Sequence, residues 1–211
     1  MTSTGSKIAR RKPIFFGCEG ESEVGYAQTL GDIFDEQNLS IHLDAVLLSP
    51  GAGSPSSKIV MATKKIAEHE RKRSQYWKRI ILLDTDRLEN DQNERDRTNS
   101  LALENNIFIV WQRPSHEAFL LRHLQGCAQL RPATIAQATS LLVDKWPNYR
   151  KPMNRMQVAK SINSVGVRQA AAVEPELRTI LSGRSVFSMS AWPIRLATLW
   201  PVLTMICSTT G

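Results

Sequence analysis

Cysteine is scarce in this chain, and its distribution excludes several kinds of protein. Cys18, Cys127 and Cys207 lie far apart and show no paired spacing. A secreted disulfide framework is therefore not expected, and a reducing cytoplasm suits the chain better. No Cys/His cluster has the spacing of a zinc site. Cys18 ends an apolar run and is expected to be a small core residue rather than a nucleophile.

No apolar run is long enough to predict a membrane span. The stretch from 186 to 207 is rich in apolar residues, but Pro193, Arg195 and Pro201 interrupt it well short of the roughly 20 residues that a span needs. The polar, basic start of the chain is not typical of a signal sequence. We therefore expect a cytoplasmic protein without stable membrane insertion. Residues 183–211 are predicted to be a hydrophobic tail that packs against the domain or a partner.

The glycine motifs of nucleotide-binding proteins are also missing. No glycine triplet follows the first apolar run, so a dinucleotide fingerprint is absent. The nearest approach to a phosphate-binding loop, Gly51–Lys58, has Ser57 in place of the second glycine, Ile59 in place of the metal-binding hydroxyl, and Pro55 in place of an amide donor. No Gly-x-Ser-x-Gly motif occurs. We therefore expect neither bound ATP nor a bound dinucleotide. Hydrolysis by a catalytic serine is not expected either.

The chain has an ordinary globular composition and a positive charge. Its 211 residues fit one large domain, and an apolar share of 42% with a charged share of 22% argues against disorder. The net charge of +7 favours polyanionic partners, whether nucleic acid, anionic lipid or an acidic protein. Cations gather ahead of the apolar run 80–83, at Lys64, Lys65, Arg71, Lys72 and Arg73. We expect these cations to flank an acidic site and hold a phosphodiester backbone; a solvated helix face is the alternative.

Hydrophobic periodicity predicts an α/β fold. Short apolar runs at 14–18, 43–48, 80–83 and 107–111 read as buried strands, with 80–83 the best central strand. Helical patterns alternate with them, which predicts a Rossmann-like, mostly parallel central sheet flanked by helices. From residue 116 onward the pattern is helical, at 118–124, 133–146, 155–162 and 167–181. We expect a catalytic core over 1–125 and a helical extension over 126–182 that completes the domain.

Acidic residues follow three of the predicted strands. Glu19 comes after the first, Asp84 and Asp86 after the third, and Glu117 after the fourth. Ligands bind outside the carboxyl ends of strands in open α/β sheets, so these side chains should meet at one rim. Carboxylates that lie so close together repel one another unless a proton or a cation lies between them. Their hard oxygen atoms select Mg²⁺ or Mn²⁺. The sequence therefore predicts a metal site formed by Glu19, Glu23, Asp84 and Asp86.

Each of these features also has a purely structural interpretation. Glu19-Gly20 is a common strand-to-helix turn, and Asp84-Thr85-Asp86 is a common polar turn. His116 and His123 are of a kind that is more often hydrogen-bonded within a core than catalytic. If Glu19 is buried beside the two aspartates, its pKa should rise and it could act as a general base or acid.

The order of these motifs resembles a known family. Glu19-Gly20-Glu21-Ser22-Glu23, Gly53-Ser54-Pro55, Asp84-Thr85-Asp86 and the segment 114–123 follow the order seen in TOPRIM domains, and within that group they are most similar to the RloB-like family. The resemblance implies that Glu19 and Glu23 are its first acids, Asp84 and Asp86 its aspartate pair, and Glu117 and His123 its late acid and histidine. His116 and Phe119 depart from the aromatic residue and the tryptophan that the late motif usually has.

The leading expectation is a Mg²⁺-dependent nuclease that cleaves DNA or RNA, with Mn²⁺ as the other candidate cation. Glu19, Asp84, Asp86, Glu117 and His123 are its expected catalytic residues. The resemblance implies an effector of a prokaryotic defence or restriction-linked system, often paired with a separate ATPase. The alternative is a non-catalytic regulatory or nucleic-acid-binding partner of such an ATPase. Homo-oligomerisation is left open, and a topoisomerase- or primase-like function has the least support.

Overall fold

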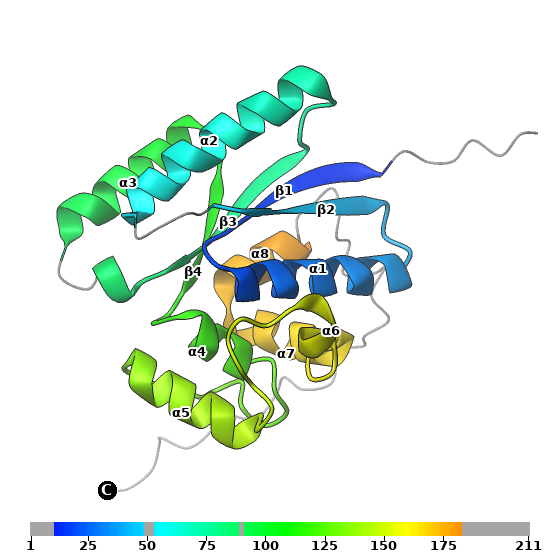
Figure 1. The fold of residues 1–211 in the computed structure, drawn as a ribbon, viewed down its shortest axis with the longest axis vertical. Coiled ribbons are helices and arrows are strands. Elements are labelled where there is room, and N and C mark those ends of the chain that lie inside the picture. Colours follow the sequence, from blue (N-terminus) through cyan, green and yellow to red (C-terminus); the bar gives the residue numbers. More distant parts are fainter. Residues whose placement is uncertain (1–10, 49–52, 89–90, 183–211) are drawn as a thin grey trace, which may run out of the picture.

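Four parallel strands form the centre of the molecule (Figure 1). The structure is a computed structural model that describes residues 11–48, 53–88 and 91–182, so the predicted tail 183–211 lies outside the described residues. The strands are β1 (Lys12–Cys18), β2 (Ile41–Leu47), β3 (Lys78–Asp84) and β4 (Phe108–Gln112), paired in the order β2-β1-β3-β4. Every pair is parallel. The α/β class, the parallel sheet and the central place of β3 are confirmed.

The register of β1 against β3 explains why acids far apart in sequence reach one edge. Gly17 is level with Ile81, so Glu19, two residues beyond Gly17, continues to about the level of Leu83. Asp84 is the last residue of β3. Because parallel strands end at the same edge of a sheet, Glu19 and Asp84 leave neighbouring strands at nearly the same height.

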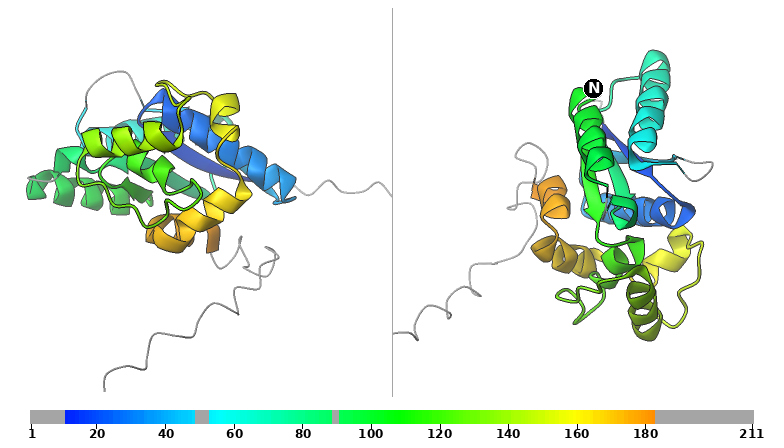
Figure 2. Two further views of the ribbon diagram at one scale, coloured as in Figure 1. Left: turned by 90° about the horizontal axis from the view of Figure 1, so that it is seen from below. Right: turned by 90° about the vertical axis from the view of Figure 1, so that its left-hand side faces the viewer.

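Helices cover both faces of the sheet (Figure 2). Helices α2 (Pro55–Lys72) and α3 (Gln92–Glu104) pack on one face around a cluster that includes Phe15, Ile59 and Ile81. The larger cluster on the other face includes Tyr26, Phe119 and Val167. Its helices are α1 (Glu21–Glu36), α4 (His116–Leu121), α5 (Ile135–Lys145), α6 (Arg155–Ala159), α7 (Ser164–Val173) and α8 (Pro175–Ser182). No helix in the described ranges is long and apolar enough to cross a membrane.

The helix predicted over 167–181 is wrong in one respect, because α7 and α8 are separate. Glu174 between them has an extended backbone, with φ −109° and ψ 101°. Pro175 disfavours a helical conformation for the residue before it and has no N–H to continue the hydrogen-bond ladder. A proline is well tolerated at the first position of a helix, and α8 begins at Pro175.

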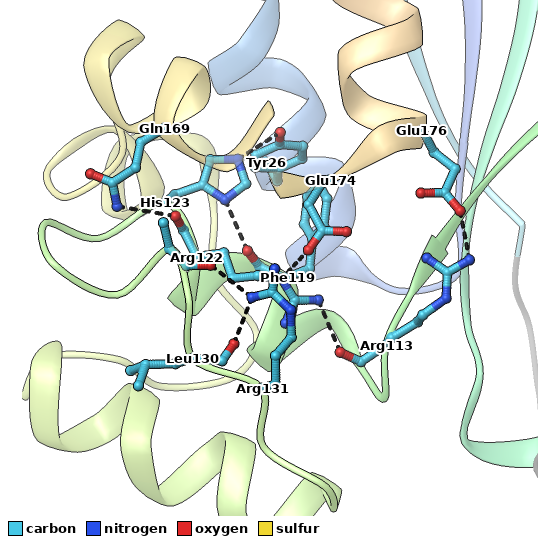
Figure 3. Close-up of polar contacts among 11 residues, drawn as sticks. Tyr26, Arg113, Phe119, Arg122, His123, Leu130, Arg131, Gln169, Glu174 and Glu176 are labelled. Carbon is cyan, nitrogen blue, oxygen red and sulfur yellow. Dashed lines mark hydrogen bonds and ion pairs between the residues drawn. The ribbon is translucent and has the colours of Figure 1, made fainter. Parts of the chain in front are cut away.

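A buried ion pair joins the end of α4 to the start of α8 (Figure 3). The Arg122 side chain is 1% exposed, and its guanidinium Nε pairs with the Glu174 carboxylate. Its Nη2 donates a hydrogen bond to the carbonyl oxygen of Arg113 at 2.9 Å. Removing one member of a buried pair leaves an uncompensated charge, which is strongly destabilising. This contact therefore fixes the helical part of the chain on the sheet.

Helix α1 packs so closely on the segment leading into α6 that residue 25 has to be glycine. A Cβ added at Gly25 would lie 2.3 Å from the carbonyl oxygen of Met153 and 3.0 Å from the carbonyl carbon of Asn154. Both atoms belong to backbone, which cannot rotate away. We expect Gly25→Ala to lower the free energy of unfolding by about 1–3 kcal/mol, the usual cost of overpacking. Urea denaturation followed by circular dichroism measures this change.

Gly31 provides a matched control in the same helix. A Cβ there would meet only the Leu43 Cβ, at the ordinary contact distance of 3.8 Å. Since alanine is favoured over glycine inside a helix by up to about 1 kcal/mol, Gly31→Ala should hold or raise stability. Equal destabilisation by both substitutions would contradict the close α1–α6 contact.

Candidate metal centre

An open pocket of about 480 Å³ lies at the carboxyl ends of β1 and β3. It brings together all four residues predicted to hold a metal: Glu19, Glu23, Asp84 and Asp86. The full lining is Glu19, Gly20, Glu21, Ser22, Glu23, Asp84, Asp86, Lys151 and Pro152. Two separate strand ends and the first turn of α1 thus place their acids around one space.

Gly20 connects β1 to α1 and gives Glu23 room. It is the N-cap residue of α1, with φ −136° and ψ 177°, an extended conformation that any residue can adopt. A Cβ at this position would lie 2.9 Å from Oε2 of Glu23. Glycine is therefore favoured here because the Glu23 carboxylate approaches the backbone, and not because the turn needs an unusual φ. A larger residue would press the carboxylate away from its present position.

Asp84 and Asp86 reach the pocket from different local structures. Asp84 ends β3, whereas Asp86 begins the short 3-10 helix η1 (Asp86–Leu88). Asp86 therefore does not continue the extended strand that Asp84 ends. The chain turns at Thr85, whose N–H donates hydrogen bonds to the carbonyl oxygens of Gln112, at 3.1 Å, and Pro114, at 3.2 Å. The turn still leaves both carboxylates on the pocket wall.

Asp84 has a strongly perturbed carboxyl group in the pocket. Burial, followed by the negative charges of Glu23, Glu19, Asp86 and Glu117, raises its pKa from 3.8 to about 9. Its Oδ1 is buried and has no hydrogen-bond partner in the described part of the chain. A buried polar atom without a partner is costly, so this oxygen lacks a proton donor or a cation. The expectation that the pKa of Glu19 is raised stays a prediction.

Glu117 lies behind the pocket and is held by three side chains. It is 1% exposed. Ser115 Oγ donates to its Oε2 at 2.8 Å, Tyr149 Oη donates to its Oε1 at 3.1 Å, and Lys151 Nζ pairs with Oε1. Burial by itself would raise the pKa of Glu117, but Lys151 and the Ser115 hydroxyl bring it below its ordinary value. Glu117 is therefore a fixed negative charge, close enough to Asp84 to raise its pKa.

Lys151 is a cation within this acidic pocket, and it was not among the predicted site residues. It lies on the loop between α5 and α6, more than 60 residues after Asp84 in the sequence. Burial would lower the pKa of its ammonium group, but Glu117, Glu23 and Asp84 together raise it. The only hint in the sequence is that Pro147 and Pro152 enclose a short non-helical segment. Lys151 neutralises part of the charge that a bound cation would otherwise compensate.

His123, predicted to be catalytic, lies in the core (Figure 3). It is 2% exposed. Its Nδ1–H donates to the carbonyl oxygen of Phe119 at 2.9 Å, which leaves Nε2 to accept a hydrogen bond from Tyr26 Oη at 3.1 Å. Burial lowers the pKa of His123 to about 3, so the ring is neutral. Both ring nitrogens are engaged inside the protein, and His123 does not line the pocket.

The predicted basic segment lies away from the acids, so the expectation that it flanks them is wrong. Helix α2 ends at Lys72, and Arg73 precedes the start of β3 at Lys78. Asp84 is at the other end of β3, about 20 Å away at the usual rise of about 3.3 Å per residue. Lys64 and Lys65 lie about two turns before the end of α2. A role for these five cations in nucleic-acid binding stays a prediction.

The pocket fits a hard divalent cation in chemistry, although its acids are not assembled around a single point. Among the residues that the structure describes, no three His, Cys, Asp or Glu side chains form a group able to hold a metal ion. The available donors are nevertheless all carboxylate oxygens, the type that Mg²⁺ and Mn²⁺ prefer. Asp84 Oδ1 also lacks a partner. Since like charges repel, these carboxylates come closer together only when a cation lies between them.

Comparison with known proteins gives no independent information about the site. No protein-family model, curated protein or solved structure matches the chain. The fold and pocket define an α/β protein with a parallel, Rossmann-like sheet and acids at its carboxyl edge. Its similarity to the RloB-like TOPRIM family stays an expectation drawn from the motifs.

The raised pKa of Asp84 predicts how stability depends on pH in EDTA. Between pH 3.8 and about 9 the folded protein keeps a proton on Asp84 that the unfolded chain has released. The unfolded state then binds fewer protons, so the free energy of unfolding should fall as the pH rises through this window. One titrating group contributes at most about 1.4 kcal/mol per pH unit. Urea denaturation at pH 5 and pH 8 measures the difference.

Asp84→Asn isolates this effect, because asparagine does not titrate. The variant should gain stability over the wild type at pH 8 and gain much less at pH 5. Asp144→Asn is the control, since the Asp144 side chain is 66% exposed and does not line the pocket. If the free energies of unfolding of the wild type and Asp84→Asn differed by the same amount at both pH values, this result would contradict the raised pKa of Asp84.

Proposed function

We propose that this chain is a divalent-cation-dependent phosphodiesterase that cleaves nucleic acid. The observation that supports this most is the pocket at the carboxyl ends of β1 and β3, where Glu19, Glu23, Asp84 and Asp86 meet and one buried carboxylate oxygen lacks a partner. Hydrolysis of a phosphodiester requires an activated water and compensation of the charge on the phosphate. Carboxylates placed to hold a cation meet both needs.

The four pocket acids would hold Mg²⁺ or Mn²⁺. Such an ion, when bound, lowers the pKa of a coordinated water and stabilises the charge on the phosphate oxygens. Asp84 carries a proton at neutral pH in the cation-free protein, because its pKa is about 9. Cation binding therefore releases this proton, and affinity for the cation should rise with pH. Glu117 keeps its charge and holds Lys151 in place.

Two features of the chain are suited to a substrate phosphate. Gly20, Glu21 and Ser22 line the pocket, so the first turn of α1 lies at its wall. Helix amino ends offer backbone amides and a positive dipole to phosphate oxygens. Lys151 adds an ammonium group at the same wall. Its contact with Glu117 fixes the Nζ atom, so it can pair with a phosphate oxygen without being reoriented.

The biological setting of this proposal comes from the resemblance to the RloB-like family. That resemblance suggests an effector of a prokaryotic defence or restriction-linked system that acts with a separate ATPase. The net charge of +7 suits a polyanionic substrate. DNA and RNA are both candidate substrates.

A regulatory or binding subunit is the second candidate, and a specific observation favours it. The pocket acids do not form a ready metal group within the described residues, and Lys151 already neutralises Glu117. In that case the acidic pocket is inactive by itself, and a partner ATPase controls it or uses it as a binding surface. The two candidates differ in whether the chain cleaves nucleic acid without a partner.

Incubation of the purified chain with plasmid DNA, single-stranded DNA and tRNA tests the proposal. Each substrate is offered with Mg²⁺, with Mn²⁺ and with EDTA, and titration calorimetry with Mn²⁺ measures cation binding separately. We expect cleavage of at least one substrate with a cation and none with EDTA. Equal cleavage in EDTA would overturn the metal site. Cation binding without cleavage of any substrate would support the regulatory candidate.

A further inference from the structure

A tryptophan flanked by two lysines lies at the amino edge of the sheet, opposite the acidic pocket. The Nζ atoms of Lys12 and Lys78 lie 4.9 Å and 4.8 Å from the centre of the Trp77 ring. Lys12 and Lys78 are the first residues of β1 and β3. The neighbouring central strands therefore begin with cations and end next to acids.

The backbone holds this arrangement in place. The Trp77 N–H donates a hydrogen bond to the carbonyl oxygen of Pro13 at 2.8 Å, and the ring packs against the larger hydrophobic cluster. An ammonium group within about 6 Å of an aromatic ring centre is attracted by its electrons. Trp77 thus holds two positive charges near each other despite their mutual repulsion.

Three neighbouring cations at this edge are paired with acids, whereas these two lysines are not. Arg11 pairs with Asp35, Lys72 with Glu68, and Arg79 with Glu70. Within the described ranges, neither Lys12 nor Lys78 forms a salt bridge. Partial burial also lowers the pKa of Lys78, as expected for a cation that lacks a carboxylate partner. Two fixed cations without an acid form a site that an anion would complete.

We infer that Lys12 and Lys78, held by Trp77, bind the phosphate backbone of a nucleic acid at the amino edge of the sheet. The inference rests on the proposed function for the identity of the polyanion. Two adjacent ammonium groups suit successive phosphates of one strand, whose charge is regularly repeated. Arg71 and Arg73 are exposed at the nearby end of α2 and extend the positive surface.

This contact sets a minimum size for the substrate. The seven residues of β3 separate the two lysines from the acidic pocket by about 20 Å, at a rise of about 3.3 Å per residue. One strand of a DNA duplex advances about 3.4 Å per nucleotide, so at least about six base pairs lie between the two sites. The proposed substrate is therefore a polymer that extends across the protein, and small phosphodiesters would use the pocket alone.

The test is the double substitution Lys12→Gln/Lys78→Gln in the full chain. Binding of a labelled 20-base-pair duplex is followed by fluorescence anisotropy in EDTA, over a range of salt concentrations, so no cleavage is needed. The slope of log affinity against log salt should fall by about 1.8, at about 0.9 per lost phosphate contact, which makes binding at 0.1 M salt up to about 60-fold weaker. Because the assay needs neither a cation nor cleavage, a failure of the proposed pocket chemistry leaves this result unchanged, and the two outcomes are distinguished.

Three comparisons make the result specific. The double substitution Lys12→Arg/Lys78→Arg keeps both charges and should keep the salt slope. Lys145→Gln/Lys160→Gln removes the same charge from exposed positions in the helical part, and its slope should change much less. An equal loss in that control, or an unchanged slope in the Gln pair, would overturn the inference. Poly-glutamate that competes as well as DNA at equal charge would assign the surface to an acidic protein and would also overturn it.

Discussion

Asp84→Asn is expected to abolish nucleic-acid cleavage while leaving the protein folded. The substitution keeps the shape of the side chain and removes the charge from the carboxylate that ends β3 and lines the pocket. A catalytic cation contributes several kcal/mol of charge stabilisation, and each 1.4 kcal/mol is a factor of ten in rate, so we expect a loss of about a thousandfold or more. Cleavage rates at saturating Mg²⁺ and calorimetric titration with Mn²⁺ measure both effects.

Glu19→Gln should give the same result from the neighbouring strand. The matched control is Glu36→Gln, which removes one exposed negative charge from the far end of α1 and should leave cleavage unchanged. Because mutual repulsion among the pocket acids is relieved, both site variants should be as stable as the wild type in EDTA or more stable. Cleavage retained in both Asp84→Asn and Glu19→Gln would place the chemistry elsewhere.

Lys151→Met is expected to separate cation binding from cleavage. Methionine keeps much of the length of the side chain and removes the ammonium group that pairs with Glu117. The pocket then becomes more negative, so its affinity for Mn²⁺ should hold or rise. Cleavage should nevertheless fall by about 100- to 1000-fold, the usual loss when one preorganised charge-stabilising group is removed. Titration with Mn²⁺ and the cleavage rate at saturating Mg²⁺ distinguish the two effects.

The controls for this variant exploit the chemistry of the ammonium group. Lys151→Arg restores the positive charge and should recover part of the rate. Lys145→Met removes an exposed cation that pairs with Asp144 and should have no effect. If Lys151→Met lost cation affinity together with activity, the lysine would serve to hold the pocket together rather than to bind phosphate.

The position of the acids could be predicted because parallel topology determines it. Apolar runs such as 80–83 identify strands, and strands that alternate with helices must run parallel. Once this is known, Glu19 and Asp84 have to emerge at one edge, whatever their separation in sequence. The structure places both in the same pocket as Glu23 and Asp86.

The parts that could not be predicted depend on contacts without a periodic pattern. Lys151 and Tyr149 reach Glu117 from a loop, more than 30 residues later in the chain, and no local spacing marks such a contact. The prediction that the basic segment flanks the acids was wrong for a different reason. Arg73 is close to Asp84 in sequence, but an extended strand converts this small separation into about 20 Å. Nearness in sequence is a poor guide to nearness in space on either side of a strand.

The buried pair of Arg122 and Glu174 has a consequence for the order in which the protein matures on the ribosome. Arg122 directly follows α4, which carries Glu117, and its partner is made about 50 residues later. A nascent chain that stops before Glu174 would have to bury the Arg122 charge unpaired or keep α4 away from the sheet. The packing of α4 is therefore completed only when nearly all of the described chain has been synthesised. An unfinished chain can already contain the pocket acids and the side chains that hold Glu117, but it lacks the acid that compensates Arg122 at the end of α4.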